Sequence, residues 1–478
     1  MDETGRINLK KELGKEISEK HTIAIESYLS ELGFGMGQFF IWGFFFLIPI
    51  AKMSQLYLVL IIVPYLRCEW NLTTEFEVAI GSVTHIVRAL AGIPLGGLAD
   101  KYGRKKVLIC SIITFTLTGI IAASSPNKWV FLSVRVAQGF AMGLCSHIPF
   151  VYVVEVASSK YKEMAILSVA VSTYFGCVYV SGVSFFLLNS IGWRCMMVIV
   201  TVPMPLIVIG LLFTPESPRY ALVSKGKEGA LKSLETLYRL NGKVMPTICL
   251  SIKGDENAVT HGKVEERGNL RSLFSQGFAV LTILLLMMNF GHNFLSSGFG
   301  AYLPLYKSSE NFLKSNVSSE LKCMHSLNKA DLLEISTSFI GDIAGIIISA
   351  LASKKMSRIV ALRMWALLNV MTTIPLFFTI IRPLEYTALL SFKFFVSGFW
   401  YLLWMTTVET FPTVVRGAAT SFISALGDVG GIAGSVLVYS LFPVSPELVV
   451  GLFLAASLIK LLASLFWIQD TKDKTMLD

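Results

Sequence analysis

Charged residues are scarce in this chain. Asp, Glu, Lys and Arg make up 15% of its 478 residues, whereas about 25% is usual in soluble proteins. Hydrophobic residues account for 54% of the chain. This composition excludes an ordinary soluble domain and indicates a protein that crosses a lipid bilayer several times.

Several sequence patterns are also missing, and each absence excludes a class of protein. There is no phosphate-binding Gly-x-x-x-x-Gly-Lys loop, so a P-loop ATPase motor is excluded as the energy source. No set of His, Cys and carboxylate residues has metal-ligand spacing, so we expect no metal and no cofactor. No nucleophile–base arrangement indicates an enzyme, and the +9 net charge shows no nucleic-acid-binding pattern. No signal peptide precedes the first span, which we expect to direct insertion itself.

The seven cysteines follow no disulfide framework. Cys68 and Cys323 fall in loops predicted to be extracytoplasmic, where a disulfide between them and two free thiols both remain open. Asn71 and Asn316 lie in glycosylation sequons on that same side. Asn316 is the better candidate, because Asn71 lies close to the membrane.

Runs of about 20 apolar residues predict the membrane-spanning helices. Twelve such runs occur: 39–64, 78–98, 107–124, 129–152, 165–188, 196–213, 278–305, 333–353, 361–381, 387–411, 417–442 and 446–468. An even number returns both termini to one side. Basic clusters at 101–106 and 354–358 predict that this side is cytoplasmic.

The runs divide the chain into an all-α membrane protein with two halves of six helices. Residues 39–213 and 278–468 are the two predicted bundles, and repeated halves are typical of carriers that alternate access around a midplane site. Residues 1–38 and 469–478 are predicted cytoplasmic ends. Residues 214–277 form a cytoplasmic loop, in which leucines recur from Leu231 to Leu240 and predict an amphipathic surface helix.

One short segment is more specific than the composition. The stretch GGLADKYGRKK, residues 96–106, places one acid and four bases between two apolar runs, so it must form a turn at a membrane surface. Its pattern Gly-x-x-x-Asp-Lys-x-Gly-Arg-Lys resembles the cytoplasmic signature of the major facilitator superfamily. The resemblance implies that superfamily's fold of two pseudo-symmetric six-helix bundles.

Further motifs extend this resemblance over nearly the whole chain. VRVAQGFAMG (134–143), PESPRY (215–220) and ETFPTVVRGAA (409–419) are similar to the sugar and organic-ion branches. ELGFGMGQF (31–39) and LRCEWNL (66–72) resemble synaptic-vesicle-two-related proteins. This subgroup implies a plasma membrane or a secretory, synaptic-type vesicle membrane.

Ionisable residues inside predicted spans are costly and need an explanation. Lys52 lies midway along the first span, with Gln55 one turn away, where related proteins usually carry acids. Asp428 resembles an acid that binds the cation in organic cation transporters. Two alternatives remain open: Lys52 and Asp428 pair with each other, or both contact one zwitterionic substrate.

Other polar or aromatic residues complete the predicted substrate site. Arg88 is expected to serve the cavity or an interhelical pair, and Asp342 an interhelical hydrogen bond. Lys393 is expected to reach the outer surface from its span. Asn289, His292, Trp404 and the aromatics Tyr174, Phe175, Trp400 and Tyr401 are the remaining candidates.

The resemblance also implies a cytoplasmic charge network that re-forms as the bundles move. Its expected members are Asp100, Arg104, Arg135, Glu155, Glu216, Arg219, Glu409 and Arg416.

The sequence therefore predicts a secondary transporter that moves a small organic ion by alternating access, with a cation or zwitterion favoured. A proton or another ion is a candidate coupling partner. An organic anion or sugar transporter is one alternative. A non-transporting receptor or trafficking protein of the same fold is the other.

Overall fold

The computed structural model describes residues 25–145, 148–246, 274, 279–314, 329–377, 382–411 and 413–467. Within these ranges the regular elements are all helical. The predicted glycosylation site Asn316 and the predicted disulfide partner Cys323 lie outside them.

Each half of the chain folds into a set of long helices. The N-terminal half contains α2 (Met36–Trp70), α3 (Thr74–Tyr102), α4 (Arg104–Ala123), α5 (Lys128–Cys145), α6 (Ile148–Val156), α7 (Lys162–Thr201) and α8 (Pro203–Phe213). The C-terminal half contains α10 (Ala279–Lys314), α11 (Lys329–Lys355), α12 (Arg358–Thr373), α13 (Arg382–Thr410), α14 (Thr413–Leu441) and α15 (Pro446–Phe466). A separate helix, α9 (Pro218–Leu240), lies between the halves in sequence.

These helices make up the predicted twelve spans. Ten segments of the described chain are long and apolar enough to cross a membrane. One of them, residues 162–213, has 52 residues, about twice what one crossing needs. Gly192 divides this segment into two spans. Its φ of 75° is left-handed, a backbone conformation that glycine adopts without steric cost. The remaining span is α3, which contains His85 and Arg88 and begins with two acids, Glu75 and Glu77.

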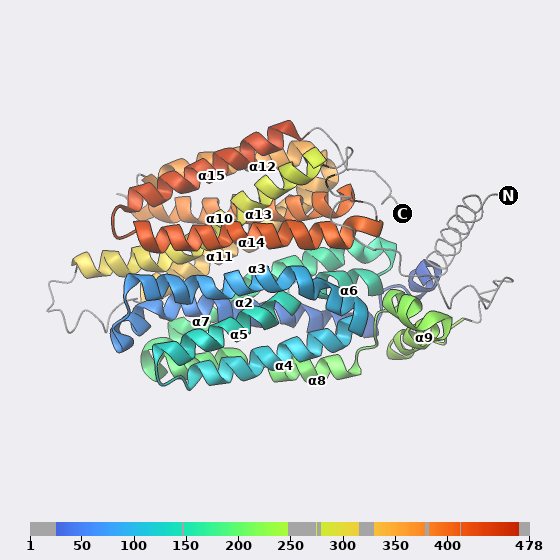
Figure 1. Cartoon of the computed structure of the whole chain (residues 1–478). Coiled ribbons are helices and arrows are strands. Elements are labelled where there is room, and N and C mark those ends of the chain that lie inside the picture. Colours follow the sequence, from blue (N-terminus) through green and yellow to red (C-terminus); the bar gives the residue numbers. More distant parts are fainter. Residues whose placement is uncertain are drawn as a thin grey trace, which may run out of the picture.

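The two halves form two layers that pack against each other (Figure 1). Between the layers, α14 packs along α3 and α11 packs along α7. The second helix of each half therefore meets the fifth helix of the other half. This reciprocal packing is the pseudo-two-fold symmetry expected of a repeated carrier fold.

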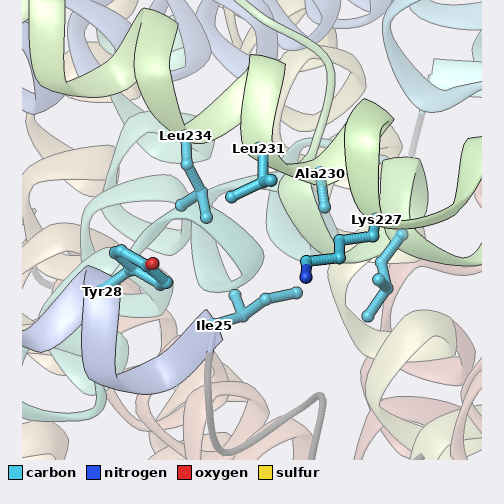
Figure 2. A pocket seen from close by; sticks show the side chains of 7 residues that line it. Ile25, Tyr28, Lys227, Ala230, Leu231 and Leu234 are labelled. Atoms are coloured by element: carbon cyan, nitrogen blue, oxygen red, sulfur yellow. The ribbon is translucent and has the colours of Figure 1, made fainter. Parts of the chain in front are cut away.

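One end of the molecule carries α9 and residues 25–32, as Figure 1 shows, and we name it the α9 end. Tyr238 Oη of α9 donates to the carbonyl oxygen of Tyr28 at 2.9 Å. Lys243 Nζ donates to the carbonyl oxygen of Leu32 at 2.8 Å. Apolar side chains of α9, among them Leu231 and Leu234, face Ile25 and Tyr28 across a small hollow into which Lys227 points (Figure 2).

Candidate functional site

Asp428 and Arg88 form an ion pair between the two bundles. Arg88 Nε on α3 donates to Asp428 Oδ2 on α14 at 2.9 Å, and Arg88 Nη2 bonds the other carboxylate oxygen. The side chains are 11% and 14% exposed. Two parallel hydrogen bonds of this kind are the strong, geometrically specific form of an Arg–carboxylate contact. Among the described residues, the ion-pair partner of Asp428 is therefore Arg88, and Lys52 acts on Asp428 only at longer range.

Lys52 and Gln55 lie beside other helices of the N-terminal bundle. Lys52 is 8% exposed and lines a small hollow with side chains of α4 and α8, among them Phe115 and Met204. Gln55 Nε2 donates to Thr201 Oγ1 at 2.8 Å, and Gln55 Oε1 accepts from Gln138 at 3.1 Å. Gln55 therefore connects the first, fourth and sixth spans through neutral hydrogen bonds.

Arg135 ends this hydrogen-bonded chain. Its Nη1 donates to Gln138 Oε1 at 2.7 Å, and its side chain is 2% exposed. Its Nε is buried and has no hydrogen-bond partner within the described part of the chain. The resemblance implied a place for Arg135 in the cytoplasmic charge network. The structure instead buries it in the first half of α5, whereas Glu155 lies near the end of the span Lys128–Val156. Among the described residues the hydrogen-bond partner of its side chain is the Gln138 amide and not an acid.

An aromatic group joins the bundles beside the ion pair. Trp400 lies 6.3 Å from Tyr174 and 6.4 Å from Phe150, and Trp404 lies 5.6 Å from Phe150, between ring centroids. The His292 ring stacks on Trp400 at 6.2 Å. Trp400 and Trp404 thus meet aromatic side chains of the other bundle, and their role as walls of a substrate site stays a prediction. Phe175 is 42% exposed and lies 5.9 Å from Phe46 of its own bundle, between ring centroids, so its place in the site stays a prediction.

Asn289 and Asn293 connect this aromatic group to Asp428. Asn293 Nδ2 donates to Asn289 Oδ1 at 2.7 Å. Gly427 lies so close that a side-chain carbon there would approach Asn293 Nδ2 to 2.7 Å. We name Arg88, Asn289, His292, Trp400, Trp404 and Asp428 the central cluster.

Lys393 is buried and does not reach the surface, so that expectation is wrong. It is 3% exposed, and its Nζ lies 3.2 Å from Asp342 Oδ2 and 4.5 Å from the Phe339 ring centroid. Because Asp342 and Phe339 lie one turn apart on α11, a single helix face supplies both contacts. Asp342 is therefore the interhelical partner of Lys393.

The sequence reasoning missed a second buried lysine, Lys460 on α15. Lys460 lies only six residues before Phe466, where its helix ends. From the sequence, a lysine so close to a helix end is expected to reach the membrane surface. The structure shows it fully buried. Only the packing of three neighbouring helices reveals this position.

Several members of the predicted charge network lie at the α9 end, and their role in alternating access stays a prediction. Arg104 contacts Glu155 at 2.8 Å, and Glu216 accepts from the Lys105 backbone N–H at 3.2 Å. Arg219 pairs with Glu26 at 2.5 Å. The side chains of Asp100 and Arg416 lie outside the described part.

Arg358, which the sequence indicated only as part of a basic cluster, joins the bundles at this end. It lies 3.0 Å from Glu409 in its own bundle and 3.5 Å from Glu163 of α7 in the other. Its contact with Glu163 is therefore an ion pair that must break when the bundles separate here.

At the opposite end, Arg67 pairs with Glu77. Asn71 is exposed and ends α2 with a φ of 47°. The sulfur of Cys68 takes part in a disulfide. Its pairing with Cys323 stays a prediction, as does glycosylation at Asn71 and Asn316. Among the described residues, no group of His, Cys, Asp and Glu side chains could hold a metal ion.

The family model of the major facilitator superfamily matches residues 32–435. The chain belongs to this superfamily. The superfamily and the transporter names of its relatives identify a multi-pass membrane transporter rather than an enzyme.

Two relatives match almost the whole of this facilitator. The putative transporter svop-1 of Caenorhabditis elegans is 24% identical over 96% of the chain and 88% of its own length. The synaptic vesicle 2-related protein of Bos taurus is 25% identical, over 95% and 82%. These matches confirm the resemblance to synaptic-vesicle-two-related proteins.

A more distant relative and a solved structure are also similar to this chain. The organic cation/carnitine transporter 7 of Arabidopsis thaliana is 22% identical over 85% of the chain and 86% of its own length. The partially occluded inward-open xylose transporter XylE of E. coli has a TM-score of 0.67 at 17% identity, over 92% of this chain and 99% of XylE. That likeness confirms the fold.

Proposed function

We propose that this facilitator is a secondary transporter that carries a small zwitterionic organic molecule by alternating access. The observation that carries the proposal is the bidentate ion pair between Arg88 and Asp428, which links α3 of one bundle to α14 of the other. A ligand at this position meets one charge of each sign.

The energetics of the pair favour a ligand with two charges. Removing one partner of a buried ion pair costs about 3–5 kcal/mol, because the other charge is left uncompensated. A cation that binds Asp428 leaves the charge of Arg88 uncompensated. An anion that binds Arg88 likewise leaves the charge of Asp428 uncompensated. A zwitterion compensates both charges as it separates the pair.

The surroundings of the pair suit the two groups of such a ligand. Trp400 and Trp404 present aromatic faces between the bundles, and an ammonium group is attracted to such faces. Arg88 supplies the planar fork that carboxylates prefer. The Arabidopsis relative is named for carnitine, which is itself a zwitterion, and this supports the same class.

The site also fits a carrier that opens to one side at a time. Because the pair joins the two bundles, its separation and re-formation are coupled to their relative movement. The synaptic-vesicle name of the Bos taurus relative supports a vesicle membrane, with the plasma membrane as the alternative. The basic clusters support cytoplasmic termini.

A second candidate is an organic anion. It is favoured by Arg135, whose buried Nε has no hydrogen-bond partner among the residues that the structure describes. A carboxylate ligand would satisfy this donor and add the counter-charge that Gln138 does not supply.

The test is a thermal-shift series on the purified full chain with three small probes: carnitine as zwitterion, choline as cation and butyrate as anion. A ligand present at 100 times its dissociation constant stabilises a protein by about 2.7 kcal/mol. We expect carnitine to stabilise the wild type most. Asp428→Asn should shift the preference toward butyrate, and Arg88→Gln toward choline.

Glu447→Gln, which changes an exposed acid at the start of α15, is the control and should keep the wild-type preference. An unchanged carnitine shift in Asp428→Asn would overturn the proposal. A larger shift with butyrate, lost in Arg135→Gln, would favour the anion. No shift with any probe, together with no uptake into proteoliposomes, would favour the non-transporting alternative.

A further inference from the structure

Lys460 is the most completely buried cationic side chain of the C-terminal bundle. It is 0% exposed. Its Nζ donates to Asn369 Oδ1 of α12 at 3.0 Å and lies 4.4 Å from the ring centroid of Phe399 on α13. Among the described residues, no carboxylate lies within ion-pair distance of it, so its partners are an amide and a ring.

The contrast with Lys393 shows that this bundle can supply a counter-charge where one is needed. Lys393 is equally inaccessible, at 3% exposed, but Asp342 lies 3.2 Å from its ammonium group. The same fold thus holds two buried lysines in different ways. Lys393 has an acid beside it, whereas Lys460 has the neutral Asn369.

The residues around Lys460 leave room for its stem and place polar groups near its amine. Gly291 of α10 leaves room for the stem: a side-chain carbon at Gly291 would approach Lys460 Cγ to 2.8 Å. Ser457 Oγ donates to the same Asn369 Oδ1 at 3.2 Å, and Thr373 Oγ1 lies 3.3 Å from Ser457 Oγ. A small polar group therefore surrounds the amine, in an otherwise apolar bundle.

The chemistry of the amine in this setting points to a proton. A buried ammonium needs a counter-charge or water, whereas a neutral amine needs only hydrogen-bond partners. A proton is also the one cationic ligand that needs no cavity. When Nζ gains or loses a proton, the charge of the bundle changes by one and the packing of its side chains need not change.

The charged and titratable groups around Lys460 come from the helices that surround it. His292 on α10 lies within electrostatic range of both Lys460 and Lys393 of α13. Arg363 on α12 bonds the last carbonyl groups of α15, at Ser464, Leu465 and Trp467. The charged residue of α14 in its described part is Asp428, which is paired with Arg88.

His292 connects this position to the central cluster. It follows Gly291, against which the Lys460 stem packs, and its ring stacks on Trp400 at 6.2 Å. Its Nδ1 is buried and has no hydrogen-bond partner in the described ranges. A charge that appears on Lys460 therefore acts on a ring that lies against the aromatic face of the substrate site.

We propose that Lys460 is a proton-binding residue of the C-terminal bundle, and that its proton is linked through His292 and Trp400 to the conformation of the central cluster. The inference does not depend on the sign of the substrate. It gives the transporter a candidate site for the coupling proton that is separate from the substrate site.

The test is thermal unfolding of the purified full chain between pH 5 and pH 10, without substrate. The variant is Lys460→Met, which keeps an unbranched side chain and removes the amine. An exposed lysine in the unfolded chain binds its proton at about pH 10.4. If the folded protein binds this proton only at a lower pH, the wild type loses stability relative to Lys460→Met as the pH falls, and the difference levels off once the folded protein has bound the proton. We expect the difference in melting temperature to change by about 2 °C or more over this range.

Two further variants make the result specific. Ser457→Ala keeps the lysine and removes a hydroxyl that shares its acceptor, so the pH at which the difference changes should move. His292→Gln keeps the lysine and removes the second titratable group, so the Lys460-dependent change should persist in that background. A melting-temperature difference that stays constant with pH overturns the proposal. If Lys460→Met does not fold, an unaltered pH profile in Ser457→Ala overturns it.

Discussion

At the scale of single residues, buried charge is the main feature of this molecule, and Lys393 with Asp342 gives the clearest prediction. Lys393→Met leaves the carboxylate of Asp342 buried at 1% exposed without its cation. We expect a loss of about 3–5 kcal/mol in stability from such an unpaired charge. Thermal unfolding of the purified protein measures it.

The double variant Lys393→Met/Asp342→Leu is the matched control for this prediction. It replaces the whole pair by apolar side chains, and replacement of a buried ion pair is often neutral or stabilising. We therefore expect the double variant to be more stable than the single one. If both lose the same stability, the pair is not the cause.

The residue scale is also where prediction from sequence is weakest. The sequence shows that Lys52, Arg88 and Asp428 lie within spans, but an ion pair between α3 and α14 depends on which helices pack together. Asp428 therefore has Arg88 as its partner rather than Lys52. Lys460 was missed for the same reason, because distance from a helix end does not show which face is buried.

At the scale of elements, α9 and residues 25–32 form the clearest unit at the α9 end. Leu234 is 1% exposed and lies on the face toward Ile25 and Tyr28 (Figure 2). We expect Leu234→Ala to cost about 2–5 kcal/mol of local stability and to increase hydrogen exchange in residues 25–32. Mass spectrometry of exchanged peptides measures this.

Leu240→Ala is the control on the same helix. Leu240 is 39% exposed, so its truncation should leave the exchange of residues 25–32 near the wild-type level. Equal exchange in the two variants would show that α9 does not hold this segment through its buried face.

The leucine pattern of α9 also shows how far a periodicity can predict an element. The helix itself follows from helix-forming residues after Gly226, whose φ of 71° bends the chain there. A spacing of three residues falls short of the 3.6-residue turn, so successive leucines drift around the helix. Leu234 and Leu237 are buried for this reason, whereas Leu240 has turned toward the outside.

At the scale of the whole molecule, hydropathy was sufficient to predict twelve spans in two halves, because the bilayer requires continuous apolar helices. The superfamily motifs were sufficient for the fold. The contacts between halves were not predictable in this way, because α3 and α14 are far apart in sequence and their shared surface is formed only when both bundles exist.

The last prediction concerns the movement of those bundles. Glu163 of α7 is 53% exposed and lies 3.5 Å from Arg358 of α12, so it joins the halves at the α9 end. Glu163→Gln removes this link and leaves Arg358 with Glu409 inside its own bundle. An exposed ion pair contributes about 0.2–1 kcal/mol, which corresponds to a change of up to about fivefold in the ratio of the two conformations.

Spin labels at the exposed positions Met164 and Val360 should show more long distances in Glu163→Gln by pulsed electron resonance. Glu334→Gln breaks a pair with Lys307 that lies within one bundle, so it should leave the distances unchanged. Equal lengthening in both variants would mean that loss of an acid loosens the protein generally, and that Glu163 does not hold the α9 end closed.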